Sequence, residues 1–208
     1  MQKTGYLELF IGPMYSGKSS TLAMKAVRHA DVGLSVLYVN HSLDNRSTKG
    51  DMTFSTHNSQ YSKMSPKVKT VKVGLLADVN IENYHVIAVD ECQFFDDLVS
   101  IVQKWVTDDH KIVYCAGLDG DCFRQSFGHT VELIPFADNI IRLQADCRLC
   151  AQNFLQLPQS EQVHTIIMKA PFTARMSNSK ELILPGADDL YIPLCRYHYD
   201  TFMSDKPS

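Results

Sequence analysis

The feature that most constrains this chain is the stretch at residues 12–19, Gly-Pro-Met-Tyr-Ser-Gly-Lys-Ser. A glycine, four further residues and then Gly-Lys-Ser is the pattern of a phosphate-binding loop. Glycine lets the backbone come close to a triphosphate, whose oxygens accept hydrogen bonds from successive N–H groups. The lysine supplies a cation for the outer phosphates, and the serine hydroxyl is a ligand for Mg²⁺. We therefore expect these positions to bind the phosphates of a nucleoside triphosphate: Gly12, Pro13, Met14, Tyr15, Ser16, Gly17, Lys18 and Ser19.

The flanks of this stretch favour a functional loop over a glycine turn with a chance lysine. Residues 7–11 form a short apolar run suited to a buried strand. Leu22, Ala23, Ala26 and Ala30 recur at helical spacing beyond the loop. Strand, loop and helix are thus predicted in order, and the helix N-terminus faces the phosphate site.

A second nucleotide-binding signature lies at residues 85–91, where an apolar strand ends in Asp90 and Glu91. Asp90 is placed to hold Mg²⁺ together with Ser19. Glu91 lies next to it, where a carboxylate can accept a proton from an attacking hydroxyl. The plainer interpretation is an acidic pair that caps the helix predicted at residues 98–105.

A long polar segment, residues 41–84, follows the strand predicted at 34–40. Asp44 and Arg46 lie early in it, just past the carboxyl end of that strand, where ligands bind in open α/β sheets. The alternative is a surface ion pair. The position favours a role in ligand binding for both residues.

Further strands are predicted at residues 68–73, 111–117 and 139–143. Strands that alternate with helices after an initial phosphate loop indicate a doubly wound, mostly parallel α/β sheet. The 208 residues, 45% of them hydrophobic, are enough for one such domain and a small appended module.

The last third of the chain carries two metal-knuckle pairs, Cys147 with Cys150 and Cys195 with His198. A gap of two residues lets both side chains of a pair converge on one ion, and three thiolates with one imidazole close a tetrahedral zinc site. A disulfide is the weaker interpretation in a chain with no secretory signal. The remaining cysteines are expected to be small buried side chains.

The zinc pairs close the base of a long excursion, residues 151–194, and thereby reduce the entropy lost in ordering it. The excursion contains Phe-Thr-Ala-Arg at 172–175, Leu-Pro-Gly at 184–186, and Tyr191. An aromatic ring, a hydroxyl and closely approaching backbone can clasp a flat base. The residues alone therefore predict a zinc-stapled phosphotransferase that acts on a small acceptor.

Composition argues against other partners. The formal net charge is −3, so no broad basic face points to nucleic acid. No apolar run approaches the ~18 residues of a membrane span, and no signal peptide is recognised before the first strand. Six cysteines without such a signal favour a reducing, cytoplasmic setting.

Together these motifs resemble the type II thymidine kinases, the zinc-containing cytosolic and viral family. The resemblance rests on the phosphate loop, on Val-Asp-Glu-Cys-Gln-Phe-Phe at 89–95 and on Leu-Asp-Gly at 118–120. The zinc knuckles and Gly-Ala-x-x-x-Tyr at 186–191 complete it. It implies a P-loop, RecA-like sheet domain at residues 1–144. A small zinc-binding domain with a lasso-type loop would follow at 145–208.

The resemblance also implies roles for single residues. The family transfers the ATP γ-phosphate to the 5′-hydroxyl of thymidine or deoxyuridine in pyrimidine salvage. Glu91 would be the general base, and Lys18 and Arg46 would stabilise the transferring phosphoryl group. Mg²⁺ would be held by Ser19, Asp44 and Asp90. The thymidine-binding positions would be Met14, Tyr15, Leu118, Phe123, Phe127, Thr173, Leu184, Pro185, Gly186 and Tyr191. Arg175 matches a basic residue of the same loop. The family's aromatic residue after Leu-Asp-x-x falls on Cys122, with Phe123 beside it, so either position can face the base.

The family works as a homotetramer and is typically inhibited by thymidine triphosphate. Rival classes fit less well. A GTPase should carry Asn-Lys-x-Asp, which the sequence lacks. A zinc-ribbon module on nucleic acid needs a basic and aromatic surface. A nucleoside monophosphate kinase does not call for zinc knuckles. Another P-loop phosphotransferase or ATPase with a structural zinc ribbon is the alternative.

Overall fold

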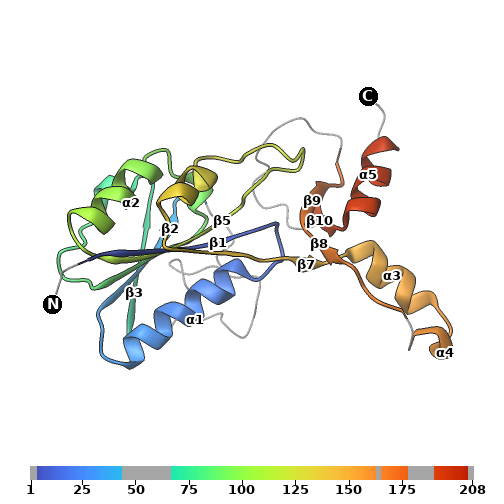
Figure 1. Ribbon diagram of the computed structural model, residues 1–208, viewed down its shortest axis with the longest axis horizontal. Coiled ribbons are helices and arrows are strands. Elements are labelled where there is room, and N and C mark those ends of the chain that lie inside the picture. Colours follow the sequence, from blue (N-terminus) through green and yellow to red (C-terminus); the bar gives the residue numbers. More distant parts are fainter. Residues whose placement is uncertain (1–3, 44–66, 163–164, 178–189, 206–208) are drawn as a thin grey trace.

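A computed structural model describes residues 4–43, 67–162, 165–177 and 190–205 of the chain (Figure 1). Its central element is a six-stranded sheet with the strand order β3-β2-β4-β5-β1-β6. Every neighbouring pair in this sheet runs parallel. The strands are β1 (Tyr6–Ile11), β2 (Val36–His41), β3 (Val68–Val73), β4 (Val86–Val89), β5 (Ile112–Gly117) and β6 (Asn139–Arg142). The prediction of a mostly parallel α/β sheet is confirmed.

Helices cover both faces of this sheet because its strands present apolar side chains to both sides. Leu7 and Leu9 of β1 belong to the core that packs under α2 (Leu98–Thr107). Phe10 points to the opposite face, where α1 (Lys18–Asp31) packs. Figure 1 shows α1 and α2 on opposite sides of the sheet. Short 3₁₀ turns complete the α2 side: η2 (Leu76–Asp78), η3 (Cys92–Phe94) and η4 (Thr130–Phe136).

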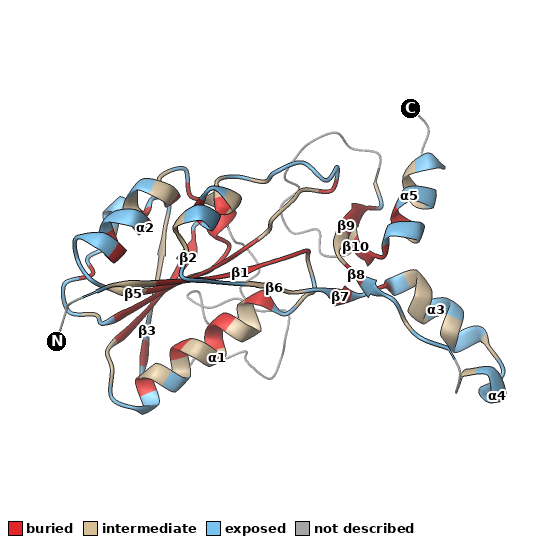
Figure 2. Cartoon of the chain, in the orientation of Figure 1, coloured by how far each residue is buried: buried red, intermediate tan, exposed pale blue. Residues whose placement is uncertain are grey.

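The C-terminal segment forms a smaller assembly past the carboxyl end of β1 (Figure 1). Two short antiparallel pairs build it, β7 (Ala145–Asp146) with β8 (Lys169–Ala170) and β9 (Phe172–Arg175) with β10 (Tyr191–Leu194). Its helices are α3 (Arg148–Gln156), α4 (Gln159–Gln162) and α5 (Arg196–Ser204). Figure 2 shows that burial concentrates in the sheet and that these helices are largely exposed. The segment has a small core of its own that includes Leu194 and Tyr199.

The arrangement brings the loop after β1 next to the C-terminal segment. The backbone N–H of Met14 donates to Thr173 Oγ1 at 2.9 Å, joining residues 159 positions apart. The hydroxyl of Tyr199 donates to the carbonyl oxygen of Cys122 at 2.7 Å, next to the loop that follows β5. Among the described helices, none has the length and apolar character that a membrane span requires.

Candidate functional site

The loop after β1 is held in a compact form by its own residues. Gly12 has φ 144°, and a Cβ at this position would lie 2.3 Å from the carbonyl oxygen of Leu143. Only glycine fits there. Lys18 Nζ donates to the carbonyl oxygen of Pro13 at 2.7 Å, and Ser16 Oγ donates to the same oxygen at 2.8 Å. Helix α1 begins at Lys18, so the N-terminal N–H groups of the helix lie at the end of the loop. The buried Lys18 side chain adds its ammonium group there.

Asp90, at the carboxyl end of β4, is fixed on both of its carboxylate oxygens. Ser19 Oγ donates to Oδ1 at 3.1 Å, and the backbone N–H of Glu91 donates to the same oxygen at 3.0 Å. On the other side, the hydroxyl of Tyr38 in β2 donates to Oδ2 at 2.8 Å. Two of the three residues predicted to hold magnesium, Ser19 and Asp90, are thus in direct contact. A serine hydroxyl and a carboxylate are the oxygen donors that Mg²⁺ prefers.

Glu91 combines burial with an unusual backbone. Its φ of 49° and ψ of 43° lie in the left-handed region, and it is 8% exposed. For an L-residue this conformation costs roughly 1–2 kcal/mol. Such local strain persists where the surroundings over-determine it, as at functional sites. The Oε2 atom of Glu91 accepts a hydrogen bond from Gln93 Nε2 at 2.5 Å.

Several residues predicted to bind the acceptor lie on β9 and β10 and in the loop after β5. Thr173 is buried and contacts the phosphate loop through Met14, as described above. Tyr191 accepts a hydrogen bond from Arg175 at 2.8 Å, with the guanidinium carbon 5.2 Å from the centre of its ring. Leu118 directly follows β5. These residues therefore lie around the same end of the sheet as the loop.

Aromatic rings gather between the carboxyl ends of β2 and β4. Phe127 meets Phe94 edge to face with ring centres 5.8 Å apart, and Phe94 lies 5.7 Å from His41. Phe123 is 43% exposed, whereas Cys122 is 4% exposed. Of the predicted base-contacting aromatics, Phe127 is the one drawn into this cluster.

A small cavity of ≈ 130 Å³ opens between the phosphate loop and β9. Both acidic and basic side chains line this cavity, and two of them form an ion pair: Arg142 Nε donates to Asp119 Oδ2 at 2.7 Å. The lining residues are Pro13, Asp119, Gly120, Asp121, Arg124, Arg142, Pro171, Phe172 and Thr173.

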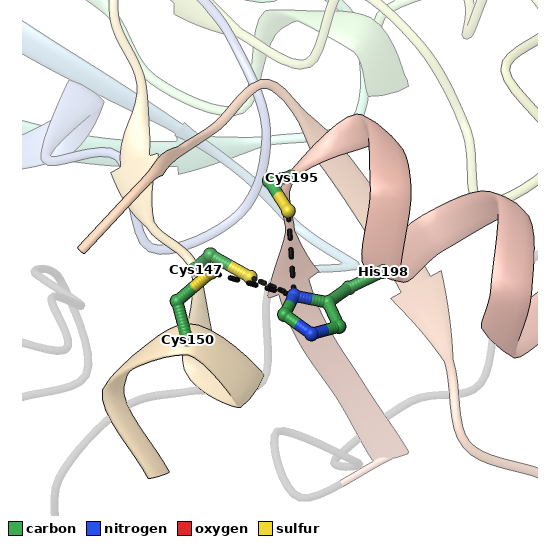
Figure 3. A group of neighbouring side chains, drawn as sticks. All are labelled: Cys147, Cys150, Cys195 and His198. Atoms are coloured by element: carbon green, nitrogen blue, oxygen red, sulfur yellow. Dashed lines mark hydrogen bonds between the residues drawn. The ribbon is translucent and has the colours of Figure 1, made fainter. Parts of the chain in front are cut away.

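The four predicted zinc ligands converge on one point (Figure 3). The donor atoms of Cys147, Cys150, Cys195 and His198 all lie within 4.8 Å of one another. His198 Nδ1 is 3.4 Å from the sulfurs of Cys147 and Cys150 and 3.3 Å from that of Cys195. Three thiols and an imidazole form a donor set that can hold a metal ion such as zinc.

The thiols of Cys147 and Cys150 have shifted pKa values. Burial raises the pKa of Cys147, but hydrogen bonds from the backbones of Cys195 and Cys150 and from the His198 side chain outweigh it and lower that pKa to about 7. The Cys150 pKa is raised to about 11, by burial and by the neighbouring Cys147 thiol. An ionised Cys147 therefore disfavours ionisation of Cys150, and a positive ion between the two sulfurs would offset this repulsion.

The other three cysteines lie apart from this cluster and are buried, as predicted. Burial raises the pKa of the Cys92 thiol to about 12, which makes it a poor nucleophile. Five predicted site residues lie outside the described part of the chain: Asp44, Arg46, Leu184, Pro185 and Gly186.

Three residues of the site were not singled out from the sequence. Tyr38 holds Asp90, Gln93 holds Glu91 and Phe94 joins the aromatic cluster. Gln93 and Phe94 belong to the run at 89–95, which was a signal that they lie near the acids. Tyr38 reads as an ordinary strand residue, so no sequence signal marked it.

Comparisons with known proteins identify relatives of the whole chain. The family model described as thymidine kinase matches residues 5–199. The chain is 34% identical to thymidine kinase a of Arabidopsis thaliana over 200 residues, covering 95% of this chain and 76% of that protein. It is 31% identical to the thymidine kinase of Amsacta moorei entomopoxvirus, covering 93% and 97%. It is 29% identical to that of Vaccinia virus (strain Ankara), covering 94% and 97%.

Proposed function

Because the chain belongs to the thymidine kinase family, we propose that it transfers the γ-phosphate of ATP to the 5′-hydroxyl of thymidine, and more slowly to that of deoxyuridine. The products are thymidine monophosphate and ADP. The observation that carries the proposal is the contact between Ser19 and Asp90, with Glu91 next in the chain. This contact brings the loop proposed to bind phosphate next to the acid proposed to bind Mg²⁺ and to the proposed base.

On the donor side, residues 12–19 bind the phosphates of ATP. Backbone N–H groups and the N-terminus of α1 face the phosphate oxygens, and Lys18 neutralises charge on the outer phosphates. Ser19 and Asp90 would hold Mg²⁺, which when bound neutralises charge on the transferring group. Asp44 and Arg46 are proposed to assist at the same point.

On the acceptor side, Glu91 accepts the proton of the 5′-hydroxyl as the oxygen attacks phosphorus. Its burial supports this role because little water competes for the carboxylate. The nucleoside would lie against Leu118, Phe127, Thr173 and Tyr191. The remaining proposed contacts are Met14, Tyr15, Phe123, Leu184, Pro185 and Gly186.

We further propose zinc as the ion of the Cys₃His cluster, with a purely structural role because four protein ligands leave no open position. The division into residues 1–144 and 145–208 follows from this role. A homotetramer, inhibition by thymidine triphosphate and a cytoplasmic location are part of the same proposal, by analogy with the family.

A nucleoside panel tests the function directly. Purified protein with Mg·ATP should phosphorylate thymidine, deoxyuridine less well and purine nucleosides least. Product formation followed by chromatography measures it. A protein that hydrolyses ATP without phosphorylating any nucleoside would instead be a P-loop ATPase with a zinc ribbon.

The role of Glu91 is tested by Glu91→Gln, which keeps the shape and removes the base. We expect kcat to fall by about 10²–10⁴-fold, the usual contribution of a general base. Binding of a fluorescent ATP analogue should change little. The exposed Glu132→Gln is the matched control. Turnover in Glu91→Gln equal to that of the control would assign the proton transfer to another group.

A further inference from the structure

Gln93 connects the two sides of the site through its side-chain amide. It lies in η3, two residues after Glu91, and is 4% exposed. Its Nε2 donates to Glu91 Oε2 at 2.5 Å. Its Oε1 accepts from the backbone N–H of Leu118 at 3.0 Å. One amide group therefore bridges the end of β4 and the end of β5.

The orientation of this amide follows from its partners. A backbone N–H can only donate, so the Gln93 oxygen must face Leu118. The amide nitrogen then faces Glu91, whose carboxylate can only accept when ionised. A glutamine at this position can therefore make both hydrogen bonds, one as donor to Glu91 and one as acceptor from Leu118. Glutamate has the same shape but would place an acceptor against an acceptor.

Gln93 fits in its place because two neighbouring residues are glycines and carry no side chain. A Cβ at Gly117 would lie 2.9 Å from Gln93 Oε1. A Cβ at Gly128 would lie 2.0 Å from the carbonyl oxygen of Gln93. Backbone therefore encloses this residue closely on two sides, and a side chain so enclosed has few alternative rotamers.

We propose that Gln93 is a positioning residue for phosphoryl transfer, which orients the Glu91 carboxylate and couples it to the acceptor wall at Leu118. The inference rests on the proposed function and goes one step beyond it. The hydrogen bond at Oε2 sets the rotation of the carboxylate, and with it the direction in which Oε1 points. A general base works only when its oxygen lies within hydrogen-bond reach of the proton that it takes.

The second hydrogen bond of Gln93 couples the base to the acceptor wall. Because Gln93 Oε1 accepts from the backbone N–H of Leu118, a shift of that wall would move the Glu91 carboxylate with it.

Two variants and a control separate positioning from folding. Gln93→Met removes both hydrogen bonds and roughly keeps the side-chain volume. Gln93→Glu keeps the shape but replaces the amide N–H that donates to Glu91 with a carboxylate oxygen, which accepts. Gln103→Met changes an exposed glutamine of α2 and serves as control. Steady-state kinetics with thymidine, which separate kcat from KM, thermal unfolding and binding of an ATP analogue are measured for each.

For Gln93→Met we expect kcat to fall by roughly 10- to 100-fold, a share of the 10²–10⁴-fold that a general base contributes. The thymidine KM and ATP binding should change less than threefold. Gln93→Glu should be slower still, although it is the closer isostere.

The opposite order overturns the proposal. If Gln93→Glu is more active than Gln93→Met, or if kcat is unchanged while the thymidine KM rises, the amide does not act on the base. Loss of ATP binding and of thermal stability in both variants would assign Gln93 to folding alone and would also overturn it. Failure of the unmodified protein to phosphorylate thymidine would instead contradict the proposed function.

Discussion

The sheet region and the C-terminal segment differ in what holds each of them together. The sheet buries apolar side chains on both faces, with long clusters under α1 and α2. The C-terminal segment buries few, and two of them, Cys147 and Cys195, belong to the predicted metal cluster. A small unit cannot bury enough apolar surface to fold alone and commonly uses a metal instead. We therefore expect the sheet region to be stabilised mainly by its core and the C-terminal segment to depend on its predicted metal cluster.

The two regions also contribute different halves of the candidate site. The sheet region supplies residues 12–19, Asp90 and Glu91, whereas the C-terminal segment supplies Thr173 and Tyr191. Polar contacts join the halves: the Met14–Thr173 hydrogen bond, the Tyr199–Cys122 hydrogen bond and the exposed Arg124–Asp200 ion pair. Damage to the C-terminal segment should therefore affect acceptor binding before donor binding.

The largest effect is expected from loss of a metal ligand. Cys195→Ser should release the ion and unfold the C-terminal segment, because structural zinc contributes on the order of 10 kcal/mol to small metal-dependent units. Phosphorylation of thymidine should fall below detection, while binding of an ATP analogue persists. Elemental analysis, circular dichroism and nucleotide titration check this. Cys115→Ala, a buried cysteine of the sheet, is the control that should keep its zinc.

Retention of thymidine phosphorylation by zinc-free Cys195→Ser would show that the C-terminal segment does not depend on its ligand set. Simultaneous loss of ATP binding would show that the two regions fold as one unit. Either result would contradict the expectation that the two regions are stabilised in different ways.

A smaller effect is expected at the contact between the regions. Thr173→Val keeps the shape and removes the acceptor of the Met14 N–H, so a partly buried donor loses its partner. This should lower the free energy of unfolding by about 1–3 kcal/mol. The thymidine KM should rise more than the ATP KM, since Thr173 lies on the acceptor side. Denaturant unfolding and steady-state kinetics measure both.

Thr201→Val changes an exposed threonine of α5 in the same segment and controls for the substitution. An equal rise of the two KM values in Thr173→Val would mean that this hydrogen bond supports both substrates rather than the acceptor alone.

The smallest effect is expected from the ion pair between Arg124 and Asp200. Both side chains are about half exposed, so the pair is screened by water and salt. Asp200→Asn should change the free energy of unfolding by no more than about 1 kcal/mol, the usual range for exposed pairs. Denaturant unfolding at low and high salt checks this. A larger, salt-independent loss would show that the regions depend on this contact.

Much of the sheet region was predictable because its signals are local. The runs at 7–11 and 111–117 correspond to β1 and β5, and the valines interleaved with polar residues at 68–73 correspond to β3. The helical spacing after the loop corresponds to α1. The acid pair at the end of β4 followed from the run before it. The division at residue 144 and the roles of the site residues remain predictions.

The two knuckles were also predictable, since a gap of two residues restricts where paired side chains can point. Their convergence into one cluster required the fold, because the first pair begins α3 and the second begins α5. The predicted residues Asp44, Arg46 and 184–186 lie outside the described part of the chain, so they stay predictions.

By itself the sequence determined the strand order along the chain, the loop at 12–19, the acids after β4 and the metal donor set. These depend on periodicity, on backbone space at glycine and on short spacings, which are properties of neighbouring residues. Tertiary structure alone decided that Tyr38 holds Asp90, that Gln93 joins Glu91 to Leu118 and that Thr173 meets Met14. The physical reason is that such hydrogen bonds depend on the packing of distant elements, which no local pattern encodes.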